Sequence, residues 1–244
     1  MLSIFRKEIN GFFSTLTGYF VIIVFLLINS LFMWVFPGEW NILDSGYAGL
    51  DTLFFISPWV FLFLVPAVTM RMIAEEKRLG TIELLYSKPV TERGIVYGKF
   101  IAAVSLVLLA LIPGIIYYIS VVHLGEIPGN IDKGGTLGAV IGLFFLGAVY
   151  ASAGIFASSL TDNQVIAFIV SVLFCFFLFM GFDLVAYLPG LKNIDEFVIG
   201  LGINEHYKSM SRGVIDVRDI AYFAAVVILF NEASSLVLLS RKWR

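Results

Sequence analysis

Long runs of apolar residues alternate with short polar segments along the whole chain. A run of about 18 or more apolar residues is long enough to cross the ~30 Å hydrocarbon layer of a bilayer as an α-helix. Six runs reach this length, and the last of them contains one charge, that of Glu232. The predicted spans are 17–36, 53–70, 100–122, 137–160, 165–182 and 220–240. We therefore predict an all-α membrane protein with six transmembrane helices.

The composition supports this fold class. Hydrophobic residues make up 59% of the 244 residues and charged residues 14%, with a mean hydropathy of +0.95. Soluble domains carry roughly 25% charged residues, so an ordinary soluble enzyme is excluded. The formal net charge of −2 leaves no basic field for a nucleic-acid partner. Cys175 is the single cysteine, which excludes an intrachain disulfide and a cysteine-rich metal site.

The first sixteen residues carry a helical pattern of their own. Leu2, Phe5, Ile9, Phe12 and Leu16 recur at spacings of three and four. Residues at these spacings share one face of a helix, so we predict an amphipathic helix over 1–16 that lies in the membrane interface. A frayed basic terminus is the alternative interpretation.

The distribution of Lys and Arg predicts the orientation of the chain. With six spans and the N-terminus inside, eleven basic residues fall in the cytoplasmic parts and five outside. Cytoplasmic loops carry the excess of basic residues, so both termini and the loop 71–99 are expected in the cytoplasm. The segment 183–219 is then external, although four of the five outside basic residues lie in it.

The loop 71–99 contains helix-breaking and helix-capping residues that a plain connection between two spans does not need. Gly80 breaks the chain, and Thr81 can cap a short helix that ends before Pro89. We expect Ile82, Leu84 and Leu85 on one face of this helix and Glu83 on the other. Thr91 can cap the helix that continues into the third span. A short helix with exposed leucines is suited to docking on a partner; a plain connector is the alternative.

The same loop resembles a known signature. Ala74-Glu-Glu-Lys-Arg-Leu-Gly-Thr-Ile-Glu-Leu-Leu-Tyr-Ser-Lys-Pro89, followed by Gly98-Lys99, is similar to the coupling-helix motif of ABC-2 type exporter permeases. Ile4–Glu8 resembles the interfacial helix of that family, and 206–219 its segment before the last span. The resemblance covers nearly the whole chain and is greatest to the permease subunits associated with gliding motility in Bacteroidetes.

The resemblance implies a six-helix half-transporter of the inner membrane. It implies pairing with a second permease half, either the same chain or a related subunit, and docking on a separate ABC ATPase subunit that holds ATP and Mg²⁺. It also implies short re-entrant helices over 184–201 with Pro189-Gly190 as the turn, an exposed loop being the alternative. The docking residues that it implies are Glu75, Glu76, Gly80, Thr81, Ile82, Glu83, Leu84, Leu85 and Pro89.

The chain lacks the motif that would hydrolyse ATP. A phosphate loop needs G-x-x-x-x-G-K-[ST], but Gly98-Lys99 is followed by Phe100 and has Arg93 in place of the first glycine. Neither H-E-x-x-H nor G-x-S-x-G occurs, which argues against a membrane-embedded protease or esterase. We therefore expect no enzymatic activity and no directly bound cofactor. A non-transporting membrane scaffold of a motility or secretion machine is the alternative function.

Few polar residues lie within the spans. A charge near the centre of a transmembrane helix costs roughly 2.5–3.5 kcal/mol on insertion scales, so such residues normally face protein or water. Glu232, Asn231 and Asn29 are therefore candidates for lining a pathway, and Glu232 is equally well explained as a protonated packing residue. Gly134, just before the fourth span, and Gly138 and Gly142 within it permit close helix packing, within one subunit or between two.

Overall fold

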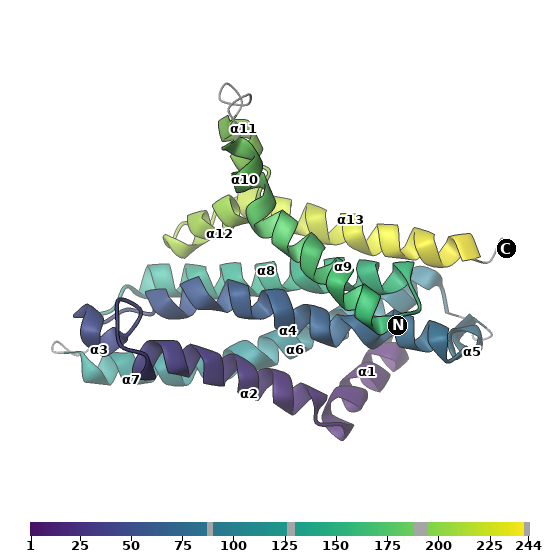
Figure 1. Ribbon diagram of the computed structural model, residues 1–244, viewed down its shortest axis with the longest axis horizontal. Helices are drawn as coiled ribbons and strands as arrows, with labels where there is room; N and C mark the ends of the chain where they lie inside the picture. The colour runs from purple at the N-terminus through teal and green to yellow at the C-terminus, as the bar shows by residue number, and fades with distance from the viewer. Residues whose placement is uncertain (87–89, 126–129, 188–194, 242–244) are drawn as a thin grey trace.

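The computed structural model describes residues 1–86, 90–125, 130–187 and 195–241. All elements in these ranges are helical, and six helices are long and apolar enough to cross a membrane (Figure 1). They are Thr17–Val35, Asp51–Arg78, Glu92–Leu124, Lys133–Leu160, Gln164–Ala186 and Val217–Ser240. Each overlaps one of the six predicted spans, so the predicted fold class is confirmed.

Several spans are built from more than one helical element. Three spans are single α-helices: α4 (Asp51–Arg78), α8 (Lys133–Leu160) and α13 (Val217–Arg241). The composite spans are α2 with η1 (Thr17–Ser30, Leu31–Val35), α6 with η2 and α7 (Glu92–Leu111, Ile112–Gly114, Ile115–Leu124), and α9 with η3 and α10 (Gln164–Phe176, Phe177–Gly181, Phe182–Ala186). The 3₁₀ turn η2 contains Pro113, which cannot donate a helical hydrogen bond. The remaining helices are α1 (Leu2–Ser14), α3 (Ile42–Ser45), α5 (Ile82–Tyr86), α11 (Asp195–Ile199) and α12 (Ile203–Ser211).

Helix α8 is the centre of the bundle. It contacts α4, α6, α9, α12 and α13, and most of its residues are buried. Its small residues allow α12 to approach closely: a Cβ at Gly138 would collide with the carbonyl oxygen of Met210, and one at Gly142 would press on Tyr207. This part of the small-residue stripe is therefore used for packing within the subunit.

Pro58 in α4 leaves a backbone carbonyl group without its helical hydrogen-bond donor, and a side chain supplies the missing donor. Pro58 has no N–H, so the carbonyl oxygen of Phe54 has no helical donor. The hydroxyl of Tyr207 on α12 donates to that oxygen over 2.7 Å. In a bilayer no water is present to satisfy such a group, so this contact holds α12 against α4.

Helix α12 is also joined to the start of α13. Nδ1 of His206 lies 2.7 Å from Oδ1 of Asp219, and Nε2 lies 3.0 Å from the carbonyl oxygen of Gly200. The imidazole stacks on Tyr222 with ring centroids 3.9 Å apart. His206 is thus part of the junction between α11, α12 and α13.

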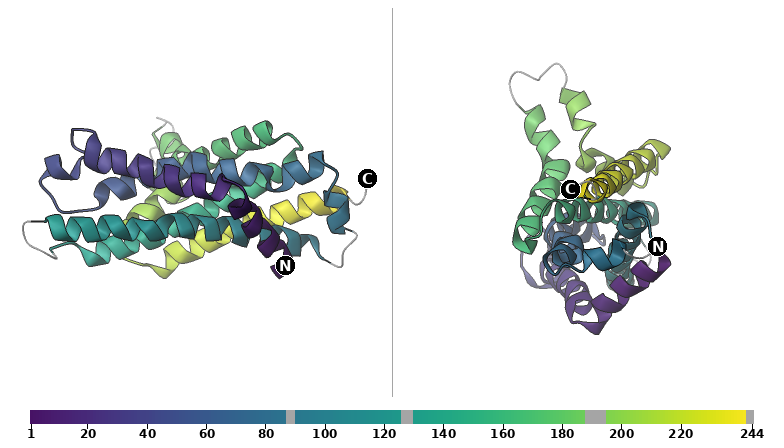
Figure 2. Two further views of the ribbon diagram at one scale, coloured as in Figure 1. Left: turned by 90° about the horizontal axis from the view of Figure 1, so that it is seen from below. Right: turned by 90° about the vertical axis from the view of Figure 1, so that its right-hand side faces the viewer.

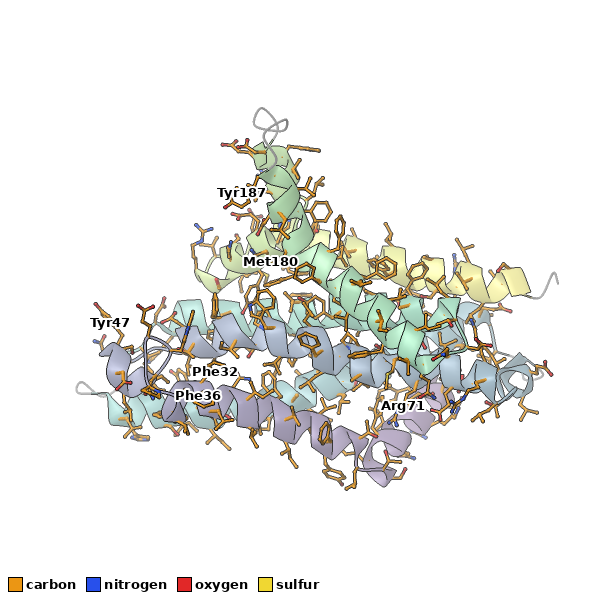
Figure 3. The ribbon with its side chains drawn as sticks, viewed as in Figure 1. Phe32, Phe36, Tyr47, Arg71, Met180 and Tyr187 are labelled. Atoms are coloured by element: carbon orange, nitrogen blue, oxygen red, sulfur yellow. The ribbon has the colours of Figure 1, made fainter. Side chains whose placement is uncertain are left out.

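The two ends of the bundle differ. α5, α1 and the last turns of α13 lie at one end, called the α5 end below, whereas α3 and α7 lie at the other, the α3 end (Figures 1 and 2). Helices α10 and α11 project from the side of the bundle, with Tyr187 pointing into the open (Figure 3). Pro189 and Gly190, the predicted re-entrant turn, lie outside the described residues.

The Tyr207 contact can be tested by removing one oxygen atom. Tyr207→Phe keeps the ring but leaves the Phe54 carbonyl oxygen without its donor, which costs about 1–3 kcal/mol for a buried group. We expect a lower melting temperature of the purified protein in detergent. Tyr187→Phe is the control, because Tyr187 is 84% exposed. Equal melting temperatures for the two variants would contradict the role of this hydroxyl group.

Candidate functional site

The α5 end begins where α4 leaves the bundle. Helix α4 ends at Arg78, and Gly80 follows with φ +69°, a left-handed conformation that glycine adopts without a Cβ penalty. α6 starts after Thr91, whose hydroxyl oxygen accepts a hydrogen bond from the N–H of Gly94 over 3.1 Å. The predicted break at Gly80 and cap at Thr91 are confirmed. Together they place α5 outside the bundle between two long helices.

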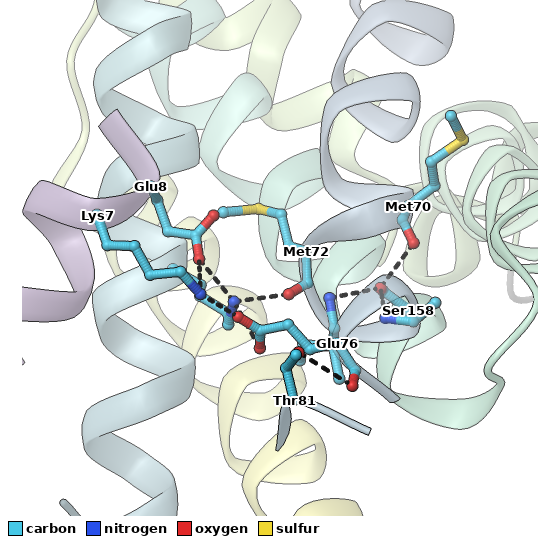
Figure 4. Close-up of polar contacts among 10 residues, drawn as sticks. Lys7, Glu8, Met70, Met72, Glu76, Thr81 and Ser158 are labelled. Carbon is cyan, nitrogen blue, oxygen red and sulfur yellow. Dashed lines mark hydrogen bonds and ion pairs between the residues drawn. The ribbon is translucent and has the colours of Figure 1, made fainter. Parts of the chain in front are cut away.

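A closed ionic cluster joins α1, α4 and α6 beside this loop (Figure 4). Its centre is Lys99, which is fully buried. Nζ of Lys99 donates to Oε1 of Glu8 (2.7 Å) and to the carbonyl oxygen of Met72 (2.6 Å), and it lies 3.0 Å from Oε2 of Glu76. A buried ammonium group is tolerable only with such partners, so these contacts fix the three helices relative to one another.

Lys7 neutralises the cluster. Its Nζ donates to Oε1 of Glu76 over 2.6 Å and lies 3.9 Å from Oε1 of Glu8. The cluster of Lys7, Glu8, Glu76 and Lys99 therefore contains two ammonium groups and two carboxylate groups, whose charges balance. Burial by itself would lower the pKa of Lys7, but the hydrogen bond and charge of Glu76, with the charge of Glu8, raise it above its ordinary value of 10.5. Stability from this group is therefore complete below pH 10.5 and is lost only as the pH rises through the higher folded-state pKa.

The end of α8 is attached to the same part of α4. Oγ of Ser158 accepts hydrogen bonds from the backbone N–H groups of Ile73 (3.1 Å) and Ala74 (2.9 Å), and it donates to the carbonyl oxygen of Met70 (2.8 Å). The Lys77 ammonium group donates to the carbonyl oxygen of Ser159. The central helix is thereby linked to the turn of α4 that carries Glu76.

The orientation of α5 differs in part from the prediction. Ile82 is 7% exposed and packs into the core, whereas Leu84 is 66% exposed and Glu83 is also exposed. The prediction that Ile82 and Leu84 share a face is wrong, because residues two apart in a helix point in directions roughly 200° apart. The side chain of Leu85 and residue Pro89 lie outside the described part of the chain.

The other residues implied by the motif divide into two groups. Glu76 is buried in the ionic cluster, and Glu75 is half-buried one position before it. Gly80 and Thr81 are exposed between α4 and α5, where the hydroxyl of Thr81 donates to the carbonyl oxygen of Glu76 over 3.4 Å. The structure therefore presents Gly80, Thr81, Glu83 and Leu84 outward and keeps Glu76 and Ile82 inside.

The pathway candidates do not form one cluster. Glu232 on α13 is paired with Arg93 at the start of α6, with 2.8 Å between Nη2 and Oε2, and it accepts a hydrogen bond from the hydroxyl of Tyr97. Asn29 is buried between α2 and α4, where it donates to the carbonyl oxygen of Phe25 and accepts from Ser57. Asn231 is buried, and its amide atoms make no hydrogen bond to the described residues.

Sequence reasoning missed three members of this region: Glu8 and Lys99 as an ion pair, and Ser158 as the link to α8. A usable signal existed for Lys99. The Thr91 cap places Lys99 two turns inside a helix, and a charge at that depth needs partners. Nothing local identifies the partners, because Glu8 is 91 positions away in the chain.

The cluster predicts unequal roles for its two lysines. Lys99→Met removes a buried charge and leaves two carboxylates with Lys7 alone, and breaking a buried pair costs about 3–5 kcal/mol. Lys7→Met affects a side chain that is 58% exposed, where ion pairs contribute about 1 kcal/mol or less. We expect a large fall in the membrane abundance and melting temperature of Lys99→Met, and a small one for Lys7→Met. Similar losses for both variants would contradict this division.

Comparison with known proteins agrees with the resemblance found in the sequence. The family model described as ABC-2 family transporter protein matches residues 52–236, more than half of the chain. No curated protein matches the chain. The matched region covers all or most of five of the six membrane-spanning helices, together with α5 and the residues of the ionic cluster that lie on α4 and α6. The chain therefore belongs to the ABC-2 family of transporter proteins.

Proposed function

We propose that this chain is the permease subunit of an ABC exporter and that α5 docks on a separate ATPase subunit. The observation that carries the proposal is the geometry of the α5 end. Glu83 and Leu84 are exposed on a short helix, while Ile82 of the same helix is buried and the adjoining end of α4 is held in the bundle by the cluster around Lys99. An exposed leucine beside a charge is a suitable anchor and rim for a partner groove.

The same contacts provide a route for mechanical coupling. A force on α5 acts on the end of α4, which is joined to α1 and α6 through Glu76 and to α8 through Ser158. Packed helices joined by buried ion pairs move as a unit, because separating them would expose unpaired charges. In this proposal, ATP-driven movement of the ATPase shifts these helices together and opens a pathway through the membrane.

We base the remaining parts of the proposed assembly on membership of the family. The chain pairs with a second permease half in the inner membrane, with the α5 end and both termini in the cytoplasm. ATP and Mg²⁺ bind to the ATPase subunit. The whole chain resembles GldF, the gliding-motility-associated permease subunit of Bacteroidetes, and we propose that export by this complex serves gliding motility.

The docking proposal predicts a local effect of one side chain. Leu84→Asp places a charge in the apolar contact, and loss of a buried anchor commonly costs about 2 kcal/mol or more of binding free energy. Tagged permease carrying this change should recover much less of the ATPase from membranes. Leu43→Asp is a matched control, because Leu43 is also 66% exposed but lies on α3 at the opposite end.

The outcome also separates an exporter from a scaffold. In a coupled exporter, the wild-type permease changes the ATP hydrolysis rate of the ATPase in nanodiscs, and Leu84→Asp abolishes that change. Undiminished recovery of the ATPase with Leu84→Asp would refute α5 as the docking element. An ATPase rate that is independent of the permease would favour the scaffold.

Glu232 remains a proposed pathway residue and has its own test. Glu232→Gln should lower permease-dependent ATP hydrolysis without lowering protein abundance, because a partly exposed ion pair contributes about 1 kcal/mol or less to stability. Arg93→Gln removes the same ion pair but keeps the carboxylate, so it should leave hydrolysis nearly unchanged. Equal losses of hydrolysis in the two variants would mean that the ion pair itself matters and that Glu232 has no separate role, and no loss in Glu232→Gln would make Glu232 a packing residue.

A further inference from the structure

A second feature lies at the α3 end, away from the docking helix. A cavity of about 950 Å³ opens there between the start of α4, the end of α7, the start of α8, η3 and α12. Cavities of this size are typical of ligand sites. Tyr47, 80% exposed, stands at its rim, and Met180 lines it from η3; both are labelled in Figure 3. We call it the α3-end cavity.

The inner wall of the α3-end cavity is apolar. Phe54, Pro58 and Trp59 on α4 face it together with Phe179 and Met180. The rings of Trp59 and Phe179 meet edge to face, with centroids 5.6 Å apart. Such a wall is suited to an acyl chain, because aromatic side chains and methionine offer large, adaptable apolar contact.

The mouth of the cavity carries charges of both signs. Asp51 at the start of α4, Asp132 before α8 and Lys208 on α12 line it and are exposed. No ion pair joins Lys208 to either aspartate within the described ranges. Asp51 and Trp59 are eight residues apart on one helix, so charged mouth and aromatic wall are separated by about 12 Å along its axis.

We propose that the α3-end cavity binds a zwitterionic amphiphile with a primary ammonium and a phosphate in its headgroup. The ammonium group lies at Asp51 and Asp132, the phosphate lies at Lys208, and the acyl chain packs on Trp59, Phe179 and Met180. The protein offers two carboxylates, Asp51 and Asp132, and one ammonium group, that of Lys208, at the mouth of the cavity. This balance of charges disfavours a purely anionic headgroup. This site lies within one subunit and does not depend on the ATPase, so it stands or falls separately from the proposed function.

Trp59 makes occupancy measurable. In the full chain with Trp34→Phe, Trp40→Phe and Trp243→Phe, Trp59 is the remaining tryptophan. Lysophosphatidylethanolamine with bromine atoms on its acyl chain is titrated into this protein in detergent, where bromine quenches nearby indole fluorescence. We expect saturable quenching that unlabelled lysophosphatidylethanolamine reverses. Lysophosphatidylglycerol lacks the ammonium group and should compete about tenfold less well, as expected for loss of one charged contact. Monoacylglycerol lacks both the ammonium group and the phosphate and should compete less well still.

Variants distinguish the site from general lipid contact. Lys208→Gln and Asp51→Asn should each weaken binding about tenfold. Lys133→Gln is the matched control, because Lys133 is an exposed lysine at the same end that does not line the cavity. Ala48 lines the cavity, so Ala48→Phe adds a ring that occupies part of its volume and should abolish saturable quenching. Size-exclusion elution confirms that each variant is folded.

Several results would overturn the proposal. Quenching that rises linearly without saturation means that Trp59 meets only detergent-dispersed lipid. Equal competition by the three headgroups means that the charges at the mouth select nothing. Stronger competition by lysophosphatidylglycerol would show an anionic preference opposite to the one proposed. Unchanged affinity of Lys208→Gln relative to Lys133→Gln would remove the phosphate contact on which the headgroup assignment rests.

Discussion

A fully buried ammonium group needs acceptors on every side, because water cannot reach it and its desolvation costs several kcal/mol. Lys99 finds them in Glu8 on α1, Glu76 on α4 and the carbonyl oxygen of Met72. This requirement sets how α1 lies against α4 and α6. The arrangement of α4 and α6 in turn sets the position of α5, because α5 lies between the end of α4 and the start of α6 in the chain. The proposed docking helix is therefore positioned by a charge that it does not touch.

A related constraint acts along the spans, where a backbone group without a partner cannot turn to water. Pro58 frees a carbonyl oxygen in α4, and Tyr207 from α12 supplies the missing donor. The glycines of α8 let α12 come close enough for that contact. The α3-end cavity lies beside the same junction, and Pro58 and Tyr207 both line it. Pro58 thus both leaves this carbonyl oxygen without a helical donor and lines the cavity beside it.

The charged side chains of the ionic cluster at the α5 end are paired with one another, whereas those described around the α3-end cavity stand apart from one another. At the α5 end, Lys7, Glu8, Glu76 and Lys99 neutralise one another, and the exposed residues beside them include Gly80, Thr81, Glu83 and Leu84. At the α3 end, Asp51, Asp132 and Lys208 stand exposed around an apolar cavity. Paired charges make a rigid attachment, whereas separated charges above an apolar wall leave room for a ligand. This difference agrees with a protein partner at one end and a lipid at the other.

The sequence by itself determined the six spans, the break at Gly80 and the cap at Thr91. These features depend on hydropathy and on local backbone preferences, which neighbouring residues carry. Tertiary structure decided that Ile82 is buried while Leu84 is exposed, that Glu8 pairs with Lys99, and that Glu232 meets Arg93. Arg93 and Glu232 are 139 positions apart, and a single chain gives no signal for such a contact. Their pairing depends on how helices cross, which packing around α8 decides.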